Sequence, residues 1–301
     1  MPKYSLQLEN ITKRFNGVPA VNHLSAQFPE GCIYGFLGPN GSGKTTTMRM
    51  ILDIIKPDSG SITVLGRSLI ARVRDRIGYM PEERGTYGKM SVIRFLVFYG
   101  TIKGTSRRRL KRSIHKWIER VGLAHVAGRK VETLSRGMQQ KVQFITTVIN
   151  SPKLVILDEP FSGLDPVNLD ILKTIMLRLR RQGKTVIFST HMMDQAEKLC
   201  DFILLLNRGE KLYDGTINRI KSQYTVNTVS LDMEGDPRLV TTLGMVEDVA
   251  PNGPRIEVRL KRNTDPQAFL RALVMKTRVR AYEVKLPTLH EIFVDIVGRH
   301  T

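Results

Sequence analysis

The stretch Gly38-Pro39-Asn40-Gly41-Ser42-Gly43-Lys44-Thr45 determines how this chain folds, because it follows the pattern G-x-x-x-x-G-K-[S/T] of a phosphate-binding loop. The apolar run 33–37 before it predicts a buried strand, and residues 46–52 can continue as a helix. Glycines let successive N–H groups turn towards one anion, and the helix presents its positive end to it. The stretch therefore predicts a nucleoside triphosphate site, in which Lys44 reaches the β- and γ-phosphates and the Thr45 hydroxyl ligates Mg²⁺.

Length and charge limit the classes of protein that need to be considered. The chain has 301 residues, enough for two domains, and a net charge of +19. It has no apolar run of the ~20 residues that a spanning helix needs, and no signal-peptide core at its start. Cys32 and Cys200 show no metal spacing, which predicts a reducing, cytoplasmic setting. Residues 101–141 hold twelve Lys and Arg against two acids. This predicts an acidic partner, either nucleic acid or an anionic membrane face, although a solvated basic face is an equal alternative.

A second pattern supplies carboxylates. The apolar run 154–157 predicts a buried strand, and Asp158 and Glu159 follow it directly. The carboxyl end of such a strand lies beside the phosphates in an α/β nucleotide-binding fold. We expect Asp158 to hold Mg²⁺, directly or through water, and Glu159 to polarise the attacking water. A pair of solvated acids is the alternative, and the nearby phosphate-binding loop makes it the poorer explanation.

The remaining patterns alternate between strands and helices, which predicts an α/β core. Residues 4–8 and 18–28 are predicted strands around the turn Asn16-Gly17. Residues 83–150 are predicted to be mostly helical, and Ser135 is an expected N-cap. The predicted domains are residues 1–221, with a helical subdomain at about 83–150, and a small α+β domain over 222–301. Helix starts are predicted in the second domain at Asp265-Pro266 and at Thr288-x-x-Glu291.

At this point the chain resembles the ATP-binding subunit of ABC transporters, over about residues 4–215. Residues 38–45 match Walker A, 154–158 Walker B, 134–140 the LSGGQ signature and 162–165 the D-loop, in the family's order and spacing. The resemblance implies a P-loop NTPase core of the ABC ATPase type with a helical subdomain. It also implies that the cofactors are ATP and Mg²⁺.

The resemblance also assigns roles to single residues. Glu159 corresponds to the catalytic glutamate, and His191 to the switch histidine that contacts the γ-phosphate. Phe15 stands where the family has an aromatic side chain that stacks on adenine. The alternative for Phe15 is an aromatic residue of the core. The alternative for His191 is an ordinary histidine without a functional role. In the family two subunits close head to tail over two ATPs, so that Ser135 and the Gly137 N–H contact the partner's γ-phosphate. The expected catalytic residues are Lys44, Glu159 and His191. The expected ATP contacts are Phe15, Gly38, Pro39, Asn40, Gly41, Ser42, Gly43, Lys44, Thr45, Thr46, Ser135 and Gly137. The expected Mg²⁺ ligands are Thr45, Glu82 and Asp158.

The chain departs from the family pattern in two places. Glu82 stands where the family usually has glutamine, and the signature has Arg136 and Met138 in place of a glycine and a glutamine. Residues 82–85 and the altered signature resemble a bacterial ABC-2-type branch linked to sodium or drug efflux. That branch commonly has a C-terminal extension ending in a Leu-x-x-Ile-Phe helix, which residues 289–293 match.

The expected function is the ATP-hydrolysing motor subunit of an ABC transporter, an exporter by its resemblance, on the inner face of the cell membrane. Its expected partners are a separate membrane-spanning subunit and a second ATP-binding subunit, identical or paralogous, and no nucleic acid. The alternative is a soluble ABC ATPase associated with nucleic acid or ribosomes. The charge permits this, but those families usually join two cassettes or insert a coiled coil or zinc module, which is not seen here. A P-loop kinase or GTPase has no use for the signature segment or His191.

Overall fold

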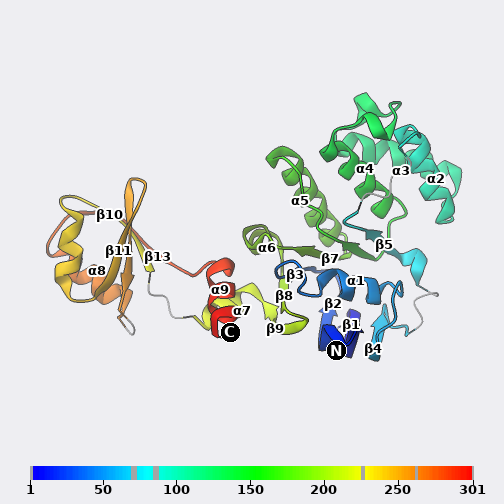
Figure 1. Cartoon of the computed structure of the whole chain (residues 1–301). Coiled ribbons are helices and arrows are strands. Elements are labelled where there is room, and N and C mark those ends of the chain that lie inside the picture. The colour runs from blue at the N-terminus through cyan, green and yellow to red at the C-terminus, as the bar shows by residue number, and fades with distance from the viewer. Residues whose placement is uncertain (1–2, 69–72, 84–87, 225–227, 262–263, 300–301) are drawn as a thin grey trace. The chain divides into compact units, whose positions relative to one another are not determined.

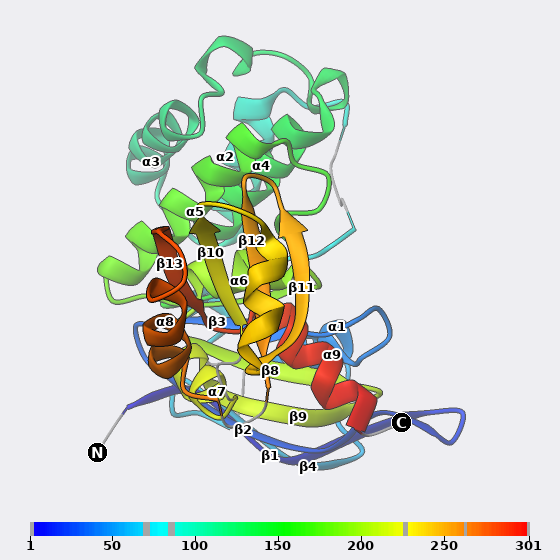
Figure 2. The same cartoon turned by 90° about the vertical axis from the view of Figure 1, so that its left-hand side faces the viewer.

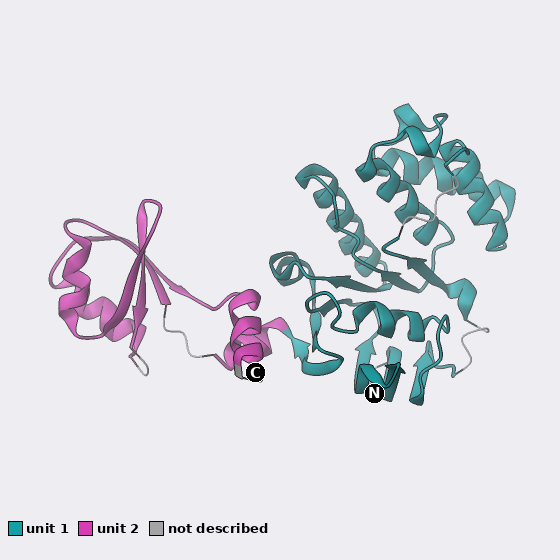
Figure 3. Ribbon diagram, in the orientation of Figure 1, with its two compact units in different colours: residues 1–216 teal, residues 217–301 magenta. Residues whose placement is uncertain are grey.

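The computed structural model describes residues 3–68, 73–83, 88–224, 228–261 and 264–299. The chain forms two compact units, residues 1–216 and 217–301 (Figure 3). This division lies ahead of the domain boundary expected after residue 221, because helix α7 (Ile217–Ser222) groups with the second unit. No helix in the described part of the chain is long and apolar enough to cross a bilayer.

The first unit is built on a six-stranded sheet. Its strands, in spatial order, are β5 (Ile77–Met80), β6 (Leu154–Leu157), β7 (Thr185–Thr190), β3 (Ile33–Leu37), β8 (Phe202–Asn207) and β9 (Glu210–Thr216). Every pair is parallel except β8 with β9. All residues of β3, β6 and β7 are buried, as expected for parallel strands covered by helices on both faces. The carboxyl ends of these three strands therefore meet at one edge.

A smaller antiparallel sheet, in the order β2-β1-β4, lies beside it and comprises β1 (Tyr4–Phe15), β2 (Val18–Pro29) and β4 (Ser59–Val64). Asn16 and Gly17 both have positive φ, 49° and 81°, which confirms the predicted tight hairpin turn. Helix α1 (Lys44–Ile51) lies between the two sheets (Figure 1) and buries Met48 and Ile51 in their common core. Helices α5 (Pro166–Arg181) and α6 (Met193–Leu199) pack on the opposite face of the large sheet.

The predicted helical region consists of α2 (Val92–Ile102), α3 (Arg107–Arg120) and α4 (Arg136–Val148), with single 3₁₀ turns before and between them (Arg74–Arg76, Ala124–Val126 and Val131–Thr133). Helix α3 buries one apolar face, which includes Leu110, Ile114 and Trp117. Ser135 caps α4 as expected: its hydroxyl accepts a hydrogen bond from the Met138 N–H at 3.3 Å. This cap fixes where the signature helix begins.

The second unit contains a four-stranded antiparallel sheet, seen with its strands side by side in Figure 2. The order is β11 (Val246–Asn252), β12 (Arg255–Leu260), β10 (Thr228–Met233) and β13 (Val279–Lys285). The sequence predicts a strand over 226–233, which corresponds to β10, and residues 226 and 227 of that range lie outside the described residues. Helix α8 (Pro266–Val274) and the 3₁₀ helix η5 (Pro237–Leu243) pack against this sheet through an apolar core that includes Phe269 and Leu273.

Local sequence signals set the helix starts of the second unit. Asp265 caps α8, accepting hydrogen bonds from the Gln267 and Ala268 N–H groups at 3.0 and 3.1 Å. Thr288 and Glu291 exchange the two hydrogen bonds of a capping box, 2.7 and 3.2 Å, at the start of α9 (Leu289–Arg299). Helix α9 packs against α7. Both predicted helix starts are confirmed.

Candidate functional site

The loop between β3 and α1 has the backbone that a phosphate-binding loop requires. Gly38 and Gly43 have φ of 153° and 98°, which L side chains rarely adopt. A Cβ at Gly38 would lie 2.2 Å from the carbonyl oxygen of Leu206, and one at Gly43 would lie 2.4 Å from that of Ala20. Among the residues that the structure describes, no side chain caps α1, which starts at Lys44. The first N–H groups of this helix are therefore presented to the loop, where an anion can bind them.

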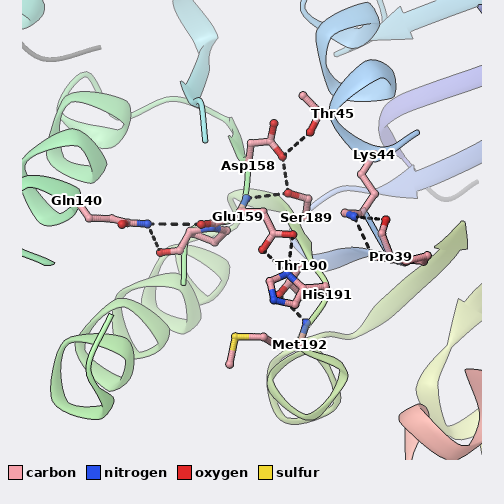
Figure 4. A network of polar contacts seen from close by, with 12 residues as sticks. Pro39, Lys44, Thr45, Gln140, Asp158, Glu159, Ser189, Thr190, His191 and Met192 are labelled. Atoms are coloured by element: carbon pink, nitrogen blue, oxygen red, sulfur yellow. Dashed lines mark hydrogen bonds and ion pairs between the residues drawn. The ribbon is translucent and has the colours of Figure 1, made fainter. Parts of the chain in front are cut away.

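The lysine of the loop is buried beside the acids. Lys44 is 6% exposed, and its Nζ donates to the carbonyl oxygens of Gly38 and Pro39 at 2.8 and 2.9 Å. Burial lowers the pKa of Lys44, while the carboxylates of Glu159, Asp158 and Glu82 oppose that shift. This places a cation at the mouth of the loop, facing the end of β6 (Figure 4).

Asp158 has one satisfied and one unsatisfied carboxylate oxygen. Its Oδ1 accepts hydrogen bonds from the Ser189 hydroxyl at 2.6 Å and from the Thr45 hydroxyl at 3.2 Å (Figure 4). Its Oδ2 is buried and has no hydrogen-bond partner among the described residues. A buried carboxylate oxygen without a partner is costly, and a cation beside Thr45 would satisfy it.

These residues fit a magnesium ion. Mg²⁺ prefers oxygen ligands and is usually bound by one or two protein groups together with substrate phosphates. The described residues contain no cluster of three or more His, Cys, Asp or Glu that could hold a metal alone. A site made of the Thr45 hydroxyl and the Asp158 carboxylate is therefore of the kind that Mg²⁺ shares with a nucleotide.

Glu159 is held in an unusual backbone conformation next to Asp158. Its φ is 47°, a left-handed value that costs a non-glycine residue about 1–3 kcal/mol and is found preferentially at functional sites. The Ser189 hydroxyl oxygen accepts a hydrogen bond from the Glu159 N–H at 2.8 Å. The side chain is 7% exposed, and both carboxylate oxygens lie 3.2 Å from Nδ1 of His191. Burial raises the pKa of Glu159, and the contact with His191 offsets part of this rise. Such a carboxylate suits a general base.

A cavity of about 340 Å³ brings many of the expected ATP contacts together. Its walls include the loop residues 40–46, together with Phe15, Glu82 and Glu159. Phe15 is 49% exposed, which excludes the alternative that it is a core aromatic. Six of the expected site residues do not line this cavity: Gly38, Pro39, Ser135, Gly137, Asp158 and His191.

Two polar residues of the site were not predicted. Ser189 is fully buried and bonds both Asp158 and Glu159. Gln140 is buried, and its Nε2 donates to the carbonyl oxygen of Pro160 at 2.8 Å (Figure 4). The available signal was a polar residue next to the apolar residues 186–188, since Ser189 is the last but one residue of the buried strand β7. In the sequence Ser189-Thr190-His191, the family resemblance assigns a role to His191 alone.

Comparisons with known proteins agree with this geometry. Residues 21–162 match the ABC transporter family, and residues 215–297 match the C-terminal domain of ATP-binding proteins described as DrrA1-3-like. The chain is 36% identical to the ABC transporter ATP-binding protein YhaQ of Bacillus subtilis (strain 168), over 97% of this chain and 98% of that one. This chain belongs to the ABC transporter ATP-binding proteins.

One further relative and one solved structure are similar to this ABC ATP-binding protein over most of its length. The Nod factor export ATP-binding protein I of Rhizobium sp. (strain N33) is 32% identical over 99% of both chains. A solved structure of the ATP binding subunit of an ABC transporter superposes with a TM-score of 0.68 and 26% identity, covering 72% of this chain and 92% of the other. The predicted ABC ATPase fold is thereby confirmed. Members of the family bind ATP and hydrolyse it to power transport, so the chain is an ATPase.

Proposed function

We propose that this ABC ATPase is the motor subunit of an exporter, closing as a head-to-tail dimer over two ATP molecules to drive a separate membrane-spanning partner. The observation that carries this proposal is the convergence of Lys44, Asp158 and Glu159 at one sheet edge, while Ser135 and Gly137 of the signature do not line the cavity beside Lys44 and Glu159. Such an arrangement supports hydrolysis in each site and leaves the signature segment free for a second subunit.

The chemistry follows from the groups that line the cavity and from Asp158 and His191, which contact the lining residues Thr45 and Glu159. Lys44 would bind the β- and γ-phosphates, and the N–H groups at the start of α1 would bind phosphate oxygens. Glu159 would take the proton of the attacking water, and His191 would orient Glu159 and contact the γ-phosphate. Thr45 and Asp158 would hold Mg²⁺, with Glu82 at the cavity wall as a further ligand. When bound, the ion neutralises charge that develops on the phosphate oxygens.

The N-terminus of α4 supports a dimer. Ser135 is exposed there, and its neighbour Arg136 is also exposed and adds a positive charge. Gly137 is buried; a Cβ on it would lie 3.2 Å from Nδ2 of Asn168, so a larger residue would crowd this turn. The positive end of a 13-residue helix with an adjacent guanidinium favours a phosphate, here the γ-phosphate bound by the second subunit.

A groove in the helical region supports a membrane-spanning partner. A cavity of about 960 Å³ lies between α2 and α3, with Ile93, Val97 and Ile114 among its apolar walls and basic side chains such as Arg107 and Lys111 at its border. Ile93 is 44% exposed, although it is apolar. Exposed apolar surface of this kind marks interaction sites. Since the basic groups frame an apolar groove, we infer a protein partner at the inner membrane face and no nucleic-acid partner.

The name of the Nod factor relative supports export as the direction of transport. The test of the proposed function is recovery of the partner: with ATP, Glu159→Gln protein is expected to retain a multi-span membrane protein from detergent-solubilised membranes.

His191→Ala is expected to move the acid limb of the ATPase pH profile to higher pH. Glu159 works as a base only when ionised, so turnover is lost as the pH falls through the pKa of Glu159. Burial raises this pKa, and the hydrogen bond and charge of His191 lower it. Without His191 the pKa rises further, and the loss starts at a higher pH. Turnover measured across pH checks this, with His191→Gln as the control that keeps a hydrogen-bond donor. Superimposable normalised profiles would show that His191 does not act on Glu159.

A further inference from the structure

Helix α4 carries two buried glutamines that bind the backbone of the active-site loops. Nε2 of Gln140 donates to the carbonyl oxygens of Pro160 at 2.8 Å and Glu159 at 3.5 Å (Figure 4). One turn further on, Nε2 of Gln143 donates to the carbonyl oxygens of Pro81 at 3.0 Å and Glu83 at 3.4 Å. The two glutamine side chains are 6% and 7% exposed. One helix face thus binds both loops that carry acids of the cavity, the one with Glu159 and the one with Glu82.

The same helix is fixed to the sheet by close backbone contact. A Cβ at Gly78 in β5 would lie 2.2 Å from the carbonyl oxygen of Thr147, so only glycine permits this approach of α4 to the strand. The Thr147 hydroxyl also donates to the carbonyl oxygen of Tyr79 at 3.3 Å. Packed interiors transmit small displacements, because they contain little free volume. A shift of α4 must therefore reach the ends of β5 and β6.

We propose that Gln140 and Gln143 are positioning residues that couple the signature segment at the start of α4 to Glu159 and Glu82 of the same chain. This rests on the proposed function, in which Ser135 meets the ATP of a second subunit. When the start of α4 engages that ATP, the two amides carry the movement to the backbone of both acidic residues. The turnover of the ATP bound by one chain then depends also on whether that chain's signature segment has closed over the ATP of the second subunit.

The alternative is that the two amides only satisfy buried carbonyl groups. A purely structural role predicts lost stability with no particular loss of turnover. A positioning role predicts lost turnover at unchanged ATP affinity, because a misplacement of about 1 Å at a catalytic group can cost about 10²-fold in rate.

Asn150, just past the far end of α4, provides a control. Its Nδ2 donates to the carbonyl oxygen of Lys103 at 3.4 Å, which belongs neither to the two acidic loops nor to the signature segment. Asn150→Leu and Gln140→Met each replace an amide that binds a backbone carbonyl with an apolar side chain of similar length. Melting temperatures measured in parallel show whether the two variants lose comparable stability.

The experiment measures kcat and ATP affinity separately for the full chain. We expect Gln140→Met and Gln143→Met each to lower kcat by about 10- to 100-fold with the ATP dissociation constant within about twofold of wild type, while Asn150→Leu keeps kcat within about twofold. In a double-mutant cycle, Ser135→Ala and Gln140→Met should be non-additive in kcat, since they act on one path.

Equal kcat in the Asn150 and Gln140 variants, or additive effects with Ser135→Ala, would overturn the positioning role. If Gln140→Met does not fold, Gln143→Met answers the same question through the other loop. Failure of the proposed function looks different: no second ATP-binding subunit, identical or paralogous, would associate with the chain when ATP is added. ATP-dependent association with normal turnover in both Gln140 and Gln143 variants would leave the motor function standing and refute the coupling alone.

Discussion

Glu159→Gln is expected to lower the ATP turnover number by about 10²- to 10⁴-fold and to leave ATP binding within about twofold of wild type. The amide has nearly the shape of the carboxylate, so the buried position beside His191 and the left-handed backbone can be retained. An amide cannot accept the proton of the attacking water. Phosphate release at saturating ATP measures the loss, and nucleotide titration measures the retained affinity.

The same variant should accumulate as an ATP-bound dimer. Two ATPs that are bound and not hydrolysed keep the proposed head-to-tail dimer closed, and light scattering with and without ATP measures its mass. Glu119→Gln is the control, because Glu119 is an exposed acid on α3 whose ion-pair partner is His115. Wild-type turnover in the Glu159 variant would remove Glu159 from its proposed role.

Lys44→Ala is expected to weaken ATP binding by about 10- to 100-fold. A hydrogen bond to a charged group contributes about 1.5–3 kcal/mol, and the buried Lys44 ammonium is positioned to make such bonds to the phosphates. Alanine also removes the hydrogen bonds to the Gly38 and Pro39 carbonyl oxygens, so the loop itself loses support. Fluorescent-nucleotide titration measures the change in affinity.

Lys184→Ala is the matched control for Lys44. Its ammonium donates to the carbonyl oxygen of Pro152 at 2.7 Å and to the Ser151 hydroxyl, and burial lowers the pKa of Lys184 too. It does not line the ATP cavity. Near-normal ATP affinity in Lys44→Ala protein would contradict the loop assignment, whereas equal losses in both variants would indicate a general effect of removing a lysine that binds backbone carbonyl groups.

The sequence predicted those parts of the fold that short stretches determine. The glycine spacing before Lys44 specifies the phosphate-binding loop because only glycine fits at Gly38 and Gly43. The helix starts at Asp265 and Thr288 were predicted from caps whose partners lie within three residues. These two caps need no tertiary information.

Other parts depend on contacts between distant segments. Ser189 reaches Asp158 because β6 and β7 pair in a register that sets Leu157 beside Phe188, which places the next residue of each strand side by side. Gln140 reaches Pro160 only once α4 packs on the sheet edge. Helix α7 has six residues, too few for a helical period to stand out in the sequence.

The most direct test of the motor function is the identity of what binds the trapped protein. Glu159→Gln protein, loaded with ATP, is to be recovered from detergent-solubilised membranes, with the Lys44→Ala protein as the control that binds ATP poorly. The proposed function predicts a multi-span membrane protein in stoichiometric amount, enriched with Glu159→Gln over Lys44→Ala. Recovery of ribosomal proteins or nucleic acid that resist moderate salt, without a membrane protein, would contradict it.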